Sequence, residues 1–456
     1  MGETFIKSLR LERIISPRIQ RLGWELFWIV LGQALTVVGA LVGVRLLTEK
    51  LNPTLYGELA LGLTMCGLVN QLAFGPLQQG ILRFFGPAQE VNEFRAYLID
   101  VWELLTKASF FILAIAGLLL IGLWFSGQGA WIVLAAMAFL LALISGYERA
   151  LDAMQSAARH RMITAWHQAI GQWLRFLLAV GLIVWLGASS SMAMLGYILA
   201  TSIVLFSQLI FFRRKFEAII LSQSHIQSDS DNKNKWTQRI RNYAWPFATW
   251  GLFLWLQQSS DRWALQTFSQ TQDVGYYAVL FQLGWWPMVL FPGIIVQFLQ
   301  PIFYRQAGDG TDPIRVMRVR KLSFMAILAF LALTGLGTGM AFILHAQIFA
   351  VFVAPEYRCV SMLMPWMVLS GGLFASSEVS ALLLMSGTNT RILITPKIST
   401  AVLGTLLNIA GAYWIGLRGV VLASVSFSII SLIWMFILSN RTQHVGINQA
   451  LRPLSS

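Results

Sequence analysis

The stretch RLLTEKLNPTLYGELAL (residues 45–61) runs from a basic residue through a short apolar segment and a polar turn to a glycine, after which a new apolar run begins. The stretch RWALQTFSQTQDVGYYAVL (residues 262–280) has the same order of features. Gly57 lies twelve residues after Arg45, and Gly275 lies thirteen residues after Arg262. Turns between apolar segments commonly carry polar residues and glycine, so chance could produce one such pair. Because each stretch forms the first turn of its half of the chain, we favour a parallel duplication.

Long apolar runs dominate the composition. Hydrophobic residues make up 57% of the 456 residues, and charged residues only 12%. A soluble protein does not have these proportions, whereas apolar runs of about 20 residues are long enough to cross a hydrocarbon layer. We therefore expect an all-α polytopic membrane protein. The runs predict twelve transmembrane helices, with approximate ranges 24–47, 55–82, 104–125, 129–151, 162–187, 190–212, 242–268, 274–303, 320–348, 361–386, 391–415 and 418–439. A count of ten stays open, because the second and eighth ranges are the least uniform.

The basic residues are unevenly distributed around these ranges. A net charge of +13 would suit nucleic-acid binding if the charges formed one soluble patch. Most of the 33 lysines and arginines instead fall on one side of the predicted helices. By the positive-inside rule this side is the cytoplasm, and both termini lie there. We expect a multi-pass protein of the cell (inner) membrane, with no nucleic acid as a partner.

A polar linker, RRKFEAIILSQSHIQSDSDNKNKW (residues 213–236), divides the chain. Six predicted helices precede it and six follow, so both halves enter the membrane in the same orientation. The first residues are basic and lack a small-residue cleavage site, which indicates an interfacial amphipathic segment. The expected parts are an N-terminal segment (1–23), an N-terminal lobe (24–212), a cytoplasmic linker (213–241), a C-terminal lobe (242–439) and a cytoplasmic tail (440–456).

Residues that carry catalysis or bind metal are sparse. Cys66 falls in a predicted helix and Cys359 in an outer loop, so neither a disulfide framework nor a metal cluster is expected. Paired carboxylates, metal-ligand spacing and nucleophile motifs do not rise above chance. A membrane glycan polymerase or ligase would be expected to have a substantial outer loop, and the longest predicted one is about residues 352–361. We expect no enzyme activity and no cofactor.

Several segments together resemble one family of membrane proteins. They are Trp24, Gly32, the two repeat stretches, GPLQQGILRFF (75–85), DRWALQTFSQTQDVGYYAV (261–279), APEYRCVSMLMPWM (354–367) and LNIAGAYWIGLRGVVLASVSFSII (407–430). The chain resembles, over nearly its whole length, polysaccharide flippases of the Wzx type, which export lipid-linked O-antigen units of lipopolysaccharide. These belong to the multidrug/oligosaccharidyl-lipid/polysaccharide exporter superfamily, together with multidrug and toxic compound extruders and lipid II flippases.

The resemblance implies two six-helix lobes around a central cavity. It implies a flippase that moves a polyprenyl-pyrophosphate-linked oligosaccharide from the cytoplasmic to the outer leaflet by alternating access. A coupling ion, H⁺ or Na⁺, and the glycan polymerase machinery are candidate partners. Some relatives have fourteen spans, and this sequence has no room for the additional two. A drug or small-molecule exporter of the same superfamily is the alternative, although that function would favour acidic over basic groups in the cavity.

The second predicted helix carries a polar stripe. Gln71, Gly75, Gln79 and Arg83 recur every four residues, and Asn70 lies beside them. Amides suit sugars and basic groups suit a pyrophosphate, so we expect Asn70, Gln71, Gln79 and Arg83 to line the cavity. Helix packing through small and amide residues would produce much the same stripe.

The fifth predicted helix places Gln172 and Arg175 near mid-membrane. An arginine at this depth needs a function or a partner, because an unpaired charge in hydrocarbon is costly. We expect both residues to contact the substrate. The alternative is a structural salt bridge from Arg175 to Asp152 or Glu378.

The end of the seventh predicted helix has adjacent charges, Asp261 and Arg262, with Gln258 one turn earlier. On a helix, Gln258 and Arg262 share one face, which we expect to look into the cavity. Arg45 occupies the corresponding end of the first helix, so the two arginines would attract the pyrophosphate. Alternatively, each arginine reaches the headgroups at a helix end, and Arg262 pairs with Asp261.

Three carboxylates inside or beside predicted helices are candidates for ion coupling or gating. They are Asp152, Asp261 and Glu378. Carboxylates in membrane pumps couple transport to protonation. Ordinary interfacial ion pairs are the alternative interpretation.

Overall fold

The computed structural model describes residues 17–222, 234–290, 313–386 and 394–451, and within these ranges the chain contains helices and short connections but no strand. Parts of five predictions lie outside the described residues: the N-terminal segment before residue 17, residues 223–233 of the linker, residues 291–303 of the eighth helix, residues 391–393 of the eleventh helix and residues 452–456 of the tail.

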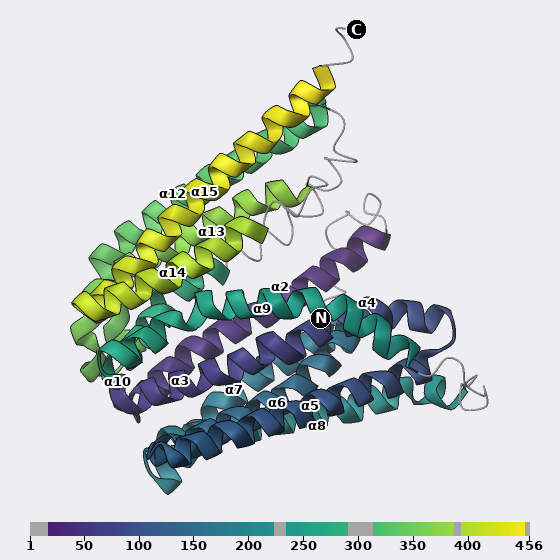
Figure 1. Cartoon of the computed structure of the whole chain (residues 1–456), viewed down its shortest axis with the longest axis horizontal. Helices are drawn as coiled ribbons and strands as arrows, with labels where there is room; N and C mark the ends of the chain where they lie inside the picture. The colour runs from purple at the N-terminus through teal and green to yellow at the C-terminus, as the bar shows by residue number, and fades with distance from the viewer. Residues whose placement is uncertain (1–16, 223–233, 291–312, 387–393, 452–456) are drawn as a thin grey trace, which may run out of the picture. The chain divides into compact units, whose positions relative to one another are not determined.

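The described chain is a succession of helices joined by short connections (Figure 1). Their bounds are α2 (Pro17–Thr48), α3 (Pro53–Val69), η2 (Asn70–Phe74), α4 (Gly75–Glu90), α5 (Phe94–Phe125), α6 (Gly129–Ala157), α7 (Arg161–Leu186), α8 (Ser190–Ser222), α9 (Lys235–Phe268), α10 (Thr271–Leu280), η4 (Phe281–Trp285), α12 (Pro313–Phe352), η5 (Pro355–Leu363), α13 (Met364–Ser386), α14 (Ile394–Ile415) and α15 (Leu417–Leu451).

Ten helical segments of the described chain are long and apolar enough to cross a membrane. They correspond to ten of the twelve predicted ranges. The predicted seventh helix is present as α9, a continuous helix that is too polar to qualify by composition. The eighth begins with α10 and η4 and then leaves the described residues. The all-α polytopic membrane fold is thereby confirmed.

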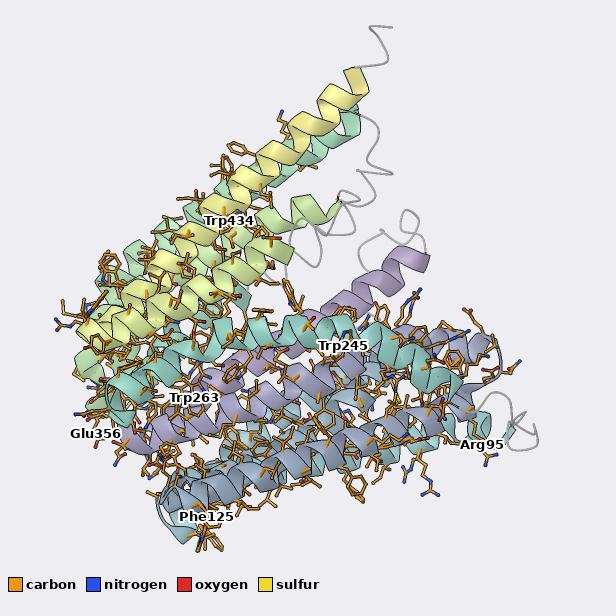
Figure 2. The ribbon with its side chains drawn as sticks, viewed as in Figure 1. Arg95, Phe125, Trp245, Trp263, Glu356 and Trp434 are labelled. Atoms are coloured by element: carbon orange, nitrogen blue, oxygen red, sulfur yellow. The ribbon has the colours of Figure 1, made fainter. Side chains whose placement is uncertain are left out.

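Large apolar side chains cover much of the helix surface. On α5, Phe110, Phe111 and Leu118 are all exposed, and Phe125 at the end of the helix is 83% exposed. Arg95 and Phe125 lie at opposite ends of this helix (Figure 2). In water such a surface would be unfavourable, whereas lipid tails match it. The exposed apolar side chains therefore indicate the part of α5 that contacts the bilayer.

The chain forms two compact units. The first comprises residues 1–43, 69–187 and 191–249, and the second comprises residues 44–68, 188–190 and 250–456. Four of the five borders fall inside helices: two lie well within α2 and α9, and two lie one residue from an end of α3 and α8. The division into lobes at the linker stays a prediction.

The first unit fixes the start of α9. Asp100 on α5 accepts hydrogen bonds from the backbone N–H groups of Trp236 and Thr237, at 3.0 and 2.9 Å. The Glu93 carboxylate accepts from the Lys235 ammonium at 2.8 Å and from the Trp236 indole at 3.1 Å. A helix start has free N–H groups and a partial positive charge, so carboxylates stabilise it. Asp100 thus acts as the N-terminal cap of α9, and Glu93 binds the side chains of the first two residues of the helix.

The second unit contains α12, α13, α14 and α15, which lie side by side (Figure 1). α13 packs against α12, α15 and η4, and α15 packs against α14. Hydroxyl groups join α13 to α15: the Ser370 hydroxyl contacts that of Ser428 at 3.0 Å, and the Ser377 hydroxyl contacts that of Ser431 at 3.0 Å. Small hydroxyl residues allow close packing of helices and satisfy each other in an apolar environment.

A π-helical segment interrupts the second helix of each half of the chain. In η2 the Gly75 N–H bonds to the Asn70 carbonyl, and in η4 the Trp286 N–H bonds to the Phe281 carbonyl. Each segment ends two residues before a proline, Pro76 or Pro287. Proline lacks an N–H and its ring clashes with the carbonyl four residues earlier, so a wider turn before it relieves the clash. The shared feature at corresponding helices supports the predicted repeat.

The two repeat glycines contact each other within the second unit. A Cβ atom added at Gly57 would lie 2.9 Å from the backbone nitrogen of Gly275 and closer still to the Thr271 carbonyl oxygen. A Cβ atom added at Gly275 would lie 3.1 Å from the nitrogen of Gly57 and closer still to the Pro53 carbonyl oxygen. The contact is reciprocal, since Pro53 and Thr271 each lie four residues before their glycine. Backbone therefore meets backbone where α3 and α10 cross.

Candidate functional site

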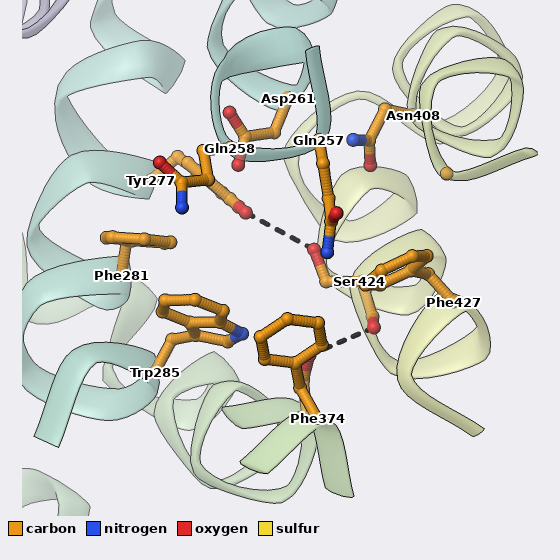
Figure 3. A pocket seen from close by; sticks show the side chains of 12 residues that line it. Gln257, Gln258, Asp261, Tyr277, Phe281, Trp285, Phe374, Asn408, Ser424 and Phe427 are labelled. Carbon is orange, nitrogen blue, oxygen red and sulfur yellow. Dashed lines mark hydrogen bonds between the residues drawn. The ribbon is translucent and has the colours of Figure 1, made fainter. Parts of the chain in front are cut away.

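A pocket lies in the second unit between helices α9, α10, α13, α14 and α15 and the η4 segment (Figure 3). It combines aromatic rings with amide, hydroxyl and carboxylate groups. Its lining residues are Gln257, Gln258, Asp261, Tyr277, Phe281, Trp285, Ser370, Phe374, Gly404, Asn408, Ser424 and Phe427.

Aromatic rings form a connected row along one side of the pocket. Phe281 and Trp285 stack with ring centroids 4.6 Å apart and planes at 19°. Trp285 neighbours Phe374 at 5.5 Å, and Phe374 neighbours Phe427 at 5.8 Å. Phe281 and Trp285 are the first and last residues of η4, so the wider turn before Pro287 positions the stacked pair. We call these four side chains the aromatic row.

Polar groups from five helices, α9, α10, α13, α14 and α15, face the same pocket. α9 contributes Gln257, Gln258 and Asp261, whose spacing places them on neighbouring rows of one helical face. Asn408 on α14 is buried and donates to the Ser260 hydroxyl at 3.0 Å. The Tyr277 and Ser424 hydroxyls lie 3.2 Å apart (Figure 3). The pocket therefore offers amides and a carboxylate on the side that α9 provides, with the aromatic row nearby.

Arg262 lies at the edge of this pocket rather than in its lining. Its guanidinium contacts Asp261 Oδ1 at 3.5 Å and donates to the Gln258 carbonyl at 2.8 Å. Its central carbon lies 4.6 Å from the ring centroid of Phe281 and 5.8 Å from that of Tyr277. The pairing of Asp261 with Arg262 agrees with the structural interpretation. The place of Asp261 and Gln258 in the lining agrees with the cavity interpretation.

Arg45, in the second unit, has partners of its own. It pairs with Glu49 at 2.6 Å and donates to the Val353 carbonyl at 2.5 Å and the Ala350 carbonyl at 3.4 Å. These contacts tie the end of α2 to the end of α12. Arg45 therefore binds carbonyl groups at the end of α12, as basic side chains near helix ends often do, whereas Arg262 binds groups of α9 and neighbouring aromatic rings.

The polar stripe of the second predicted helix has mixed surroundings. Asn70 is buried and donates to the Ser145 hydroxyl on α6 at 3.1 Å, so it serves helix packing. Gln71 is half-buried, whereas Gln79 and Arg83 are exposed. The π-helical segment starts at Asn70 and shifts the register, which separates Asn70 and Gln71 from the later part of the stripe.

Arg175 forms an ion pair in the first unit. Its guanidinium lies 3.3 Å from the Glu148 carboxylate, while Asp152 accepts a hydrogen bond from Gln168 at 3.2 Å. Within the first unit the ion pair is thus to Glu148 and not to Asp152, one of the two partners considered from sequence; the other, Glu378, pairs with Lys397 in the second unit. α6 and α7 run antiparallel, so the residue farther along α7, Arg175, meets the residue earlier on α6, Glu148. Gln172 is half-buried on the same helix.

Glu378, on α13 in the second unit, binds Lys397 on α14. The Lys397 ammonium lies 3.0 and 2.9 Å from the two carboxylate oxygens. The Glu378 side chain is 37% exposed, so it is not a deeply buried carboxylate. In the described part of the chain, no group of three or more His, Cys, Asp and Glu side chains is placed to hold a metal ion.

Sequence reasoning identified Gln258, Asp261 and Arg262 but missed most of the pocket. The aromatic row comes from apolar runs in which phenylalanine and tryptophan give no separate signal. The spacing of Phe281 and Trp285 before Pro287 is the local pattern that could have indicated a stacked pair. Asn408 could have been noted as an amide inside the eleventh predicted helix.

Comparisons with known proteins identify the fold. No family model and no curated protein matches the sequence. An inward-facing multidrug resistance MATE family transporter of the MOP superfamily matches with a TM-score of 0.68, at 12% identity over 91% of this chain and 96% of that one. Lipid II flippase MurJ, in an inward closed conformation, matches with a TM-score of 0.60, at 12% identity over 94% of this chain and 91% of that one.

A third solved structure also matches this chain. It is a MOP superfamily transporter from Pyrococcus furiosus, which is described as having a binding pocket of reverse polarity. It matches with a TM-score of 0.56, at 12% identity over 93% of this chain and 95% of that one. At such low identity the likeness establishes the fold alone. The chain has the multi-span membrane fold of MOP superfamily transporters.

Proposed function

We propose that this protein is a flippase that moves a polyprenyl-pyrophosphate-linked oligosaccharide from the cytoplasmic to the outer leaflet by alternating access. The head group would cross in a polar cavity while the lipid tail stays in the bilayer. The observation that carries the proposal is the pocket of the second unit, where an aromatic row, three amides and a carboxylate come together inside a membrane protein.

The chemistry of that pocket suits sugar rings. A pyranose presents C–H groups on its faces and hydroxyls around its rim. Aromatic faces carry a negative quadrupole that attracts polarised C–H groups, so a ring of this kind can lie on Phe281, Trp285 or Phe374. The amides of Gln257 and Gln258 both donate and accept hydrogen bonds, as hydroxyls require.

The pyrophosphate requires cationic groups, and the first unit supplies two candidates. Arg83 is exposed, and the Arg175 side chain is 32% exposed beside Glu148. An arginine fork matches phosphate oxygens, and the long 3.3 Å contact to Glu148 leaves room for exchange. Arg45, Asn70, Gln71, Gln79, Gln172, Gln258 and Arg262 complete the proposed substrate-binding set, with Asp152, Asp261 and Glu378 for coupling or gating.

The proposed setting follows from the charge distribution. Most basic residues fall on one side of the predicted helices, which supports a cytoplasmic location of both termini. An inner-membrane location is part of the same proposal. H⁺ or Na⁺ as the coupling ion and the glycan polymerase machinery as a partner belong to the same proposal.

Export of an organic cation is a second candidate function. A carboxylate beside aromatic rings, as Asp261 is beside Tyr277 and Phe281, is a common arrangement for binding such ligands. A MATE transporter among the structural neighbours supports this candidate in a general way. A glycan polymerase or ligase has no comparable support, because the structural neighbours are transporters and flippases.

Deletion of the gene in its host tests the proposal. We expect lipid-linked repeat units to accumulate on the cytoplasmic leaflet and surface polysaccharide to decrease, with both restored by the wild-type chain. Purified protein in liposomes should move a fluorescent lipid-linked oligosaccharide between leaflets. Normal surface polysaccharide in the deletion strain, together with uptake of ethidium by wild-type liposomes, would favour the cation exporter.

A further inference from the structure

We infer that Arg262 determines specificity by excluding organic cations from the pocket, because it occupies the groups that such a cation would bind. The inference rests on the proposed function, in which the ligand of the pocket is an uncharged sugar. It assigns Arg262 a role at the edge of the pocket that differs from pyrophosphate binding.

Without Arg262, the pocket would attract cations. Asp261 is 4% exposed and lines the pocket together with the rings of Tyr277 and Phe281. Without the guanidinium, this carboxylate would have no cationic partner, and a buried carboxylate in that situation either binds another cation or takes up a proton. Aromatic faces within about 6 Å would add their own attraction, which is larger in a site without water.

Arg262 already satisfies each of these groups from within the chain. Its guanidinium pairs with Asp261 Oδ1 at 3.5 Å, and its backbone N–H donates to the same oxygen at 2.7 Å. The guanidinium carbon lies 4.6 Å from the centroid of the Phe281 ring. A hydrogen bond to the Gln258 carbonyl at 2.8 Å holds the side chain in this position. The Arg262 side chain is only 11% exposed, so it forms part of the packed structure.

A ligand cation would have to displace this tethered group. The arginine is attached next to its partners, so its effective concentration there is far above that of a free ligand. A second cation close to the guanidinium would also be repelled. A neutral glycan meets neither obstacle. The contacts of Arg262 with Asp261 are to Oδ1, and a carboxylate has about four lone-pair sites, so acceptor capacity remains for a hydroxyl.

The test is binding of tetraphenylphosphonium, a lipophilic cation, to the full-length protein in nanodiscs. We expect no saturable binding to the wild type, and saturable binding to Arg262→Met, which keeps an apolar stem but removes the charge. The gain in affinity should be about 30-fold or more, which is the effect expected from one desolvated cation–π contact of about 2 kcal/mol. Arg262→Lys should exclude the cation, because it retains the charge.

A second set of variants guards against misfolding. Arg262→Gln keeps a hydrogen-bond donor for Asp261 and Gln258, and it should also gain cation binding. Adding Asp261→Asn to Arg262→Met removes both charges and should abolish the gain. Size-exclusion profiles and unfolding temperatures of all variants are compared with the wild type. The inference is overturned if the wild type binds the cation as tightly as the variants, or if neither Arg262→Met nor Arg262→Gln binds it. The measurement on the wild type tests the inference even if a variant fails to fold.

The inference and the proposed function can fail separately. If the variants gain no cation binding while the wild type still flips a lipid-linked oligosaccharide, only the role of Arg262 is wrong. If the variants bind the cation but the wild type moves no lipid-linked oligosaccharide, the proposed function is wrong and the pocket serves another neutral ligand.

Discussion

The crossing of α3 and α10 at Gly57 and Gly275 predicts a specific stability loss for Gly275→Ala. The added Cβ atom would lie 3.1 Å from the Gly57 nitrogen and 2.8 Å from the Pro53 carbonyl carbon. Side-chain Cβ atoms essentially never come closer than 3.0 Å to another heavy atom. The neighbouring atoms belong to the backbone, so no side chain can rotate away, and the two helices must move apart.

The size of the effect follows from overpacking energies. Extra methylene groups in a packed site cost about 1–3 kcal/mol, and a clash against backbone lies at the upper end of this range. The unfolding temperature of a unit of 150–250 residues falls by about 2–4 °C for each kcal/mol lost from the free energy of unfolding. A loss of about 3 kcal/mol therefore lowers the unfolding temperature by about 6–12 °C. Gly57→Ala should show a similar loss, because the contact is reciprocal.

Thermal unfolding of the purified protein in detergent, followed by tryptophan fluorescence, measures this effect. Gly117→Ala on α5 is the matched control, because a Cβ atom there meets nothing within 4 Å. The control should keep or raise the unfolding temperature, since alanine favours a helix over glycine. The double variant of Gly57 and Gly275 should lose less than the sum of the two single losses, because both act on one contact. An unfolding temperature of Gly275→Ala equal to the wild type would refute the close crossing.

Three further predictions concern the site and its support. Trp285→Leu removes a ring from the middle of the aromatic row, where it contacts Phe281 and Phe374. Loss of one aromatic contact costs about 0.5–1.5 kcal/mol, so we expect the affinity for a soluble oligosaccharide, measured by calorimetry, to fall about 2- to 10-fold. Asp100→Ala removes the acceptor for two N–H groups at the start of α9, and it should cost about 1 kcal/mol in thermal unfolding, whereas unchanged stability would contradict the capping role. Arg175→Ala should impair export while protein abundance in the membrane stays intact, and adding Glu148→Gln should not restore export if Arg175 contacts the substrate. Recovery in that double variant would instead show that Arg175 only neutralises Glu148.

The sequence was sufficient to predict where the helices lie, but it predicted the residues at which they begin and end less well. Apolar runs of the right length predict α7 within one residue at each end, and Gly187, with φ of 107°, ends it where glycine tolerates a positive φ. α5 instead begins at Phe94, ten residues before the predicted range. Its first turns contain Arg95, Asp100 and Glu103, which lower the hydropathy without disfavouring a helix. Hydropathy therefore locates the apolar part of a helix but not its polar extension.

The site was predictable where charge interrupts an apolar run. Asp261 and Arg262 are conspicuous for that reason. Their mutual pairing and their place at the edge of a pocket depend on α10 and η4, which pack nearby and which no local pattern connects to α9. The partner of Arg175 depends in the same way on the register of α7 against α6. Aromatic residues in a membrane protein can face lipid, protein or a ligand, so sequence alone does not identify Phe374 or Phe427 as residues that line the pocket.

The two compact units exchange segments between the halves of the chain. Residues 44–68, from before the linker, belong to the second unit, and residues 234–249, from after it, belong to the first. The first unit holds its exchanged segment through Asp100 and Glu93, and the second holds its own through the glycine crossing. The covalent bridge between residues 222 and 234 is therefore not the sole link between the halves. Two separately synthesised polypeptides, one for each half of the chain, should therefore associate into this fold, because each half contributes a segment to the compact unit of the other.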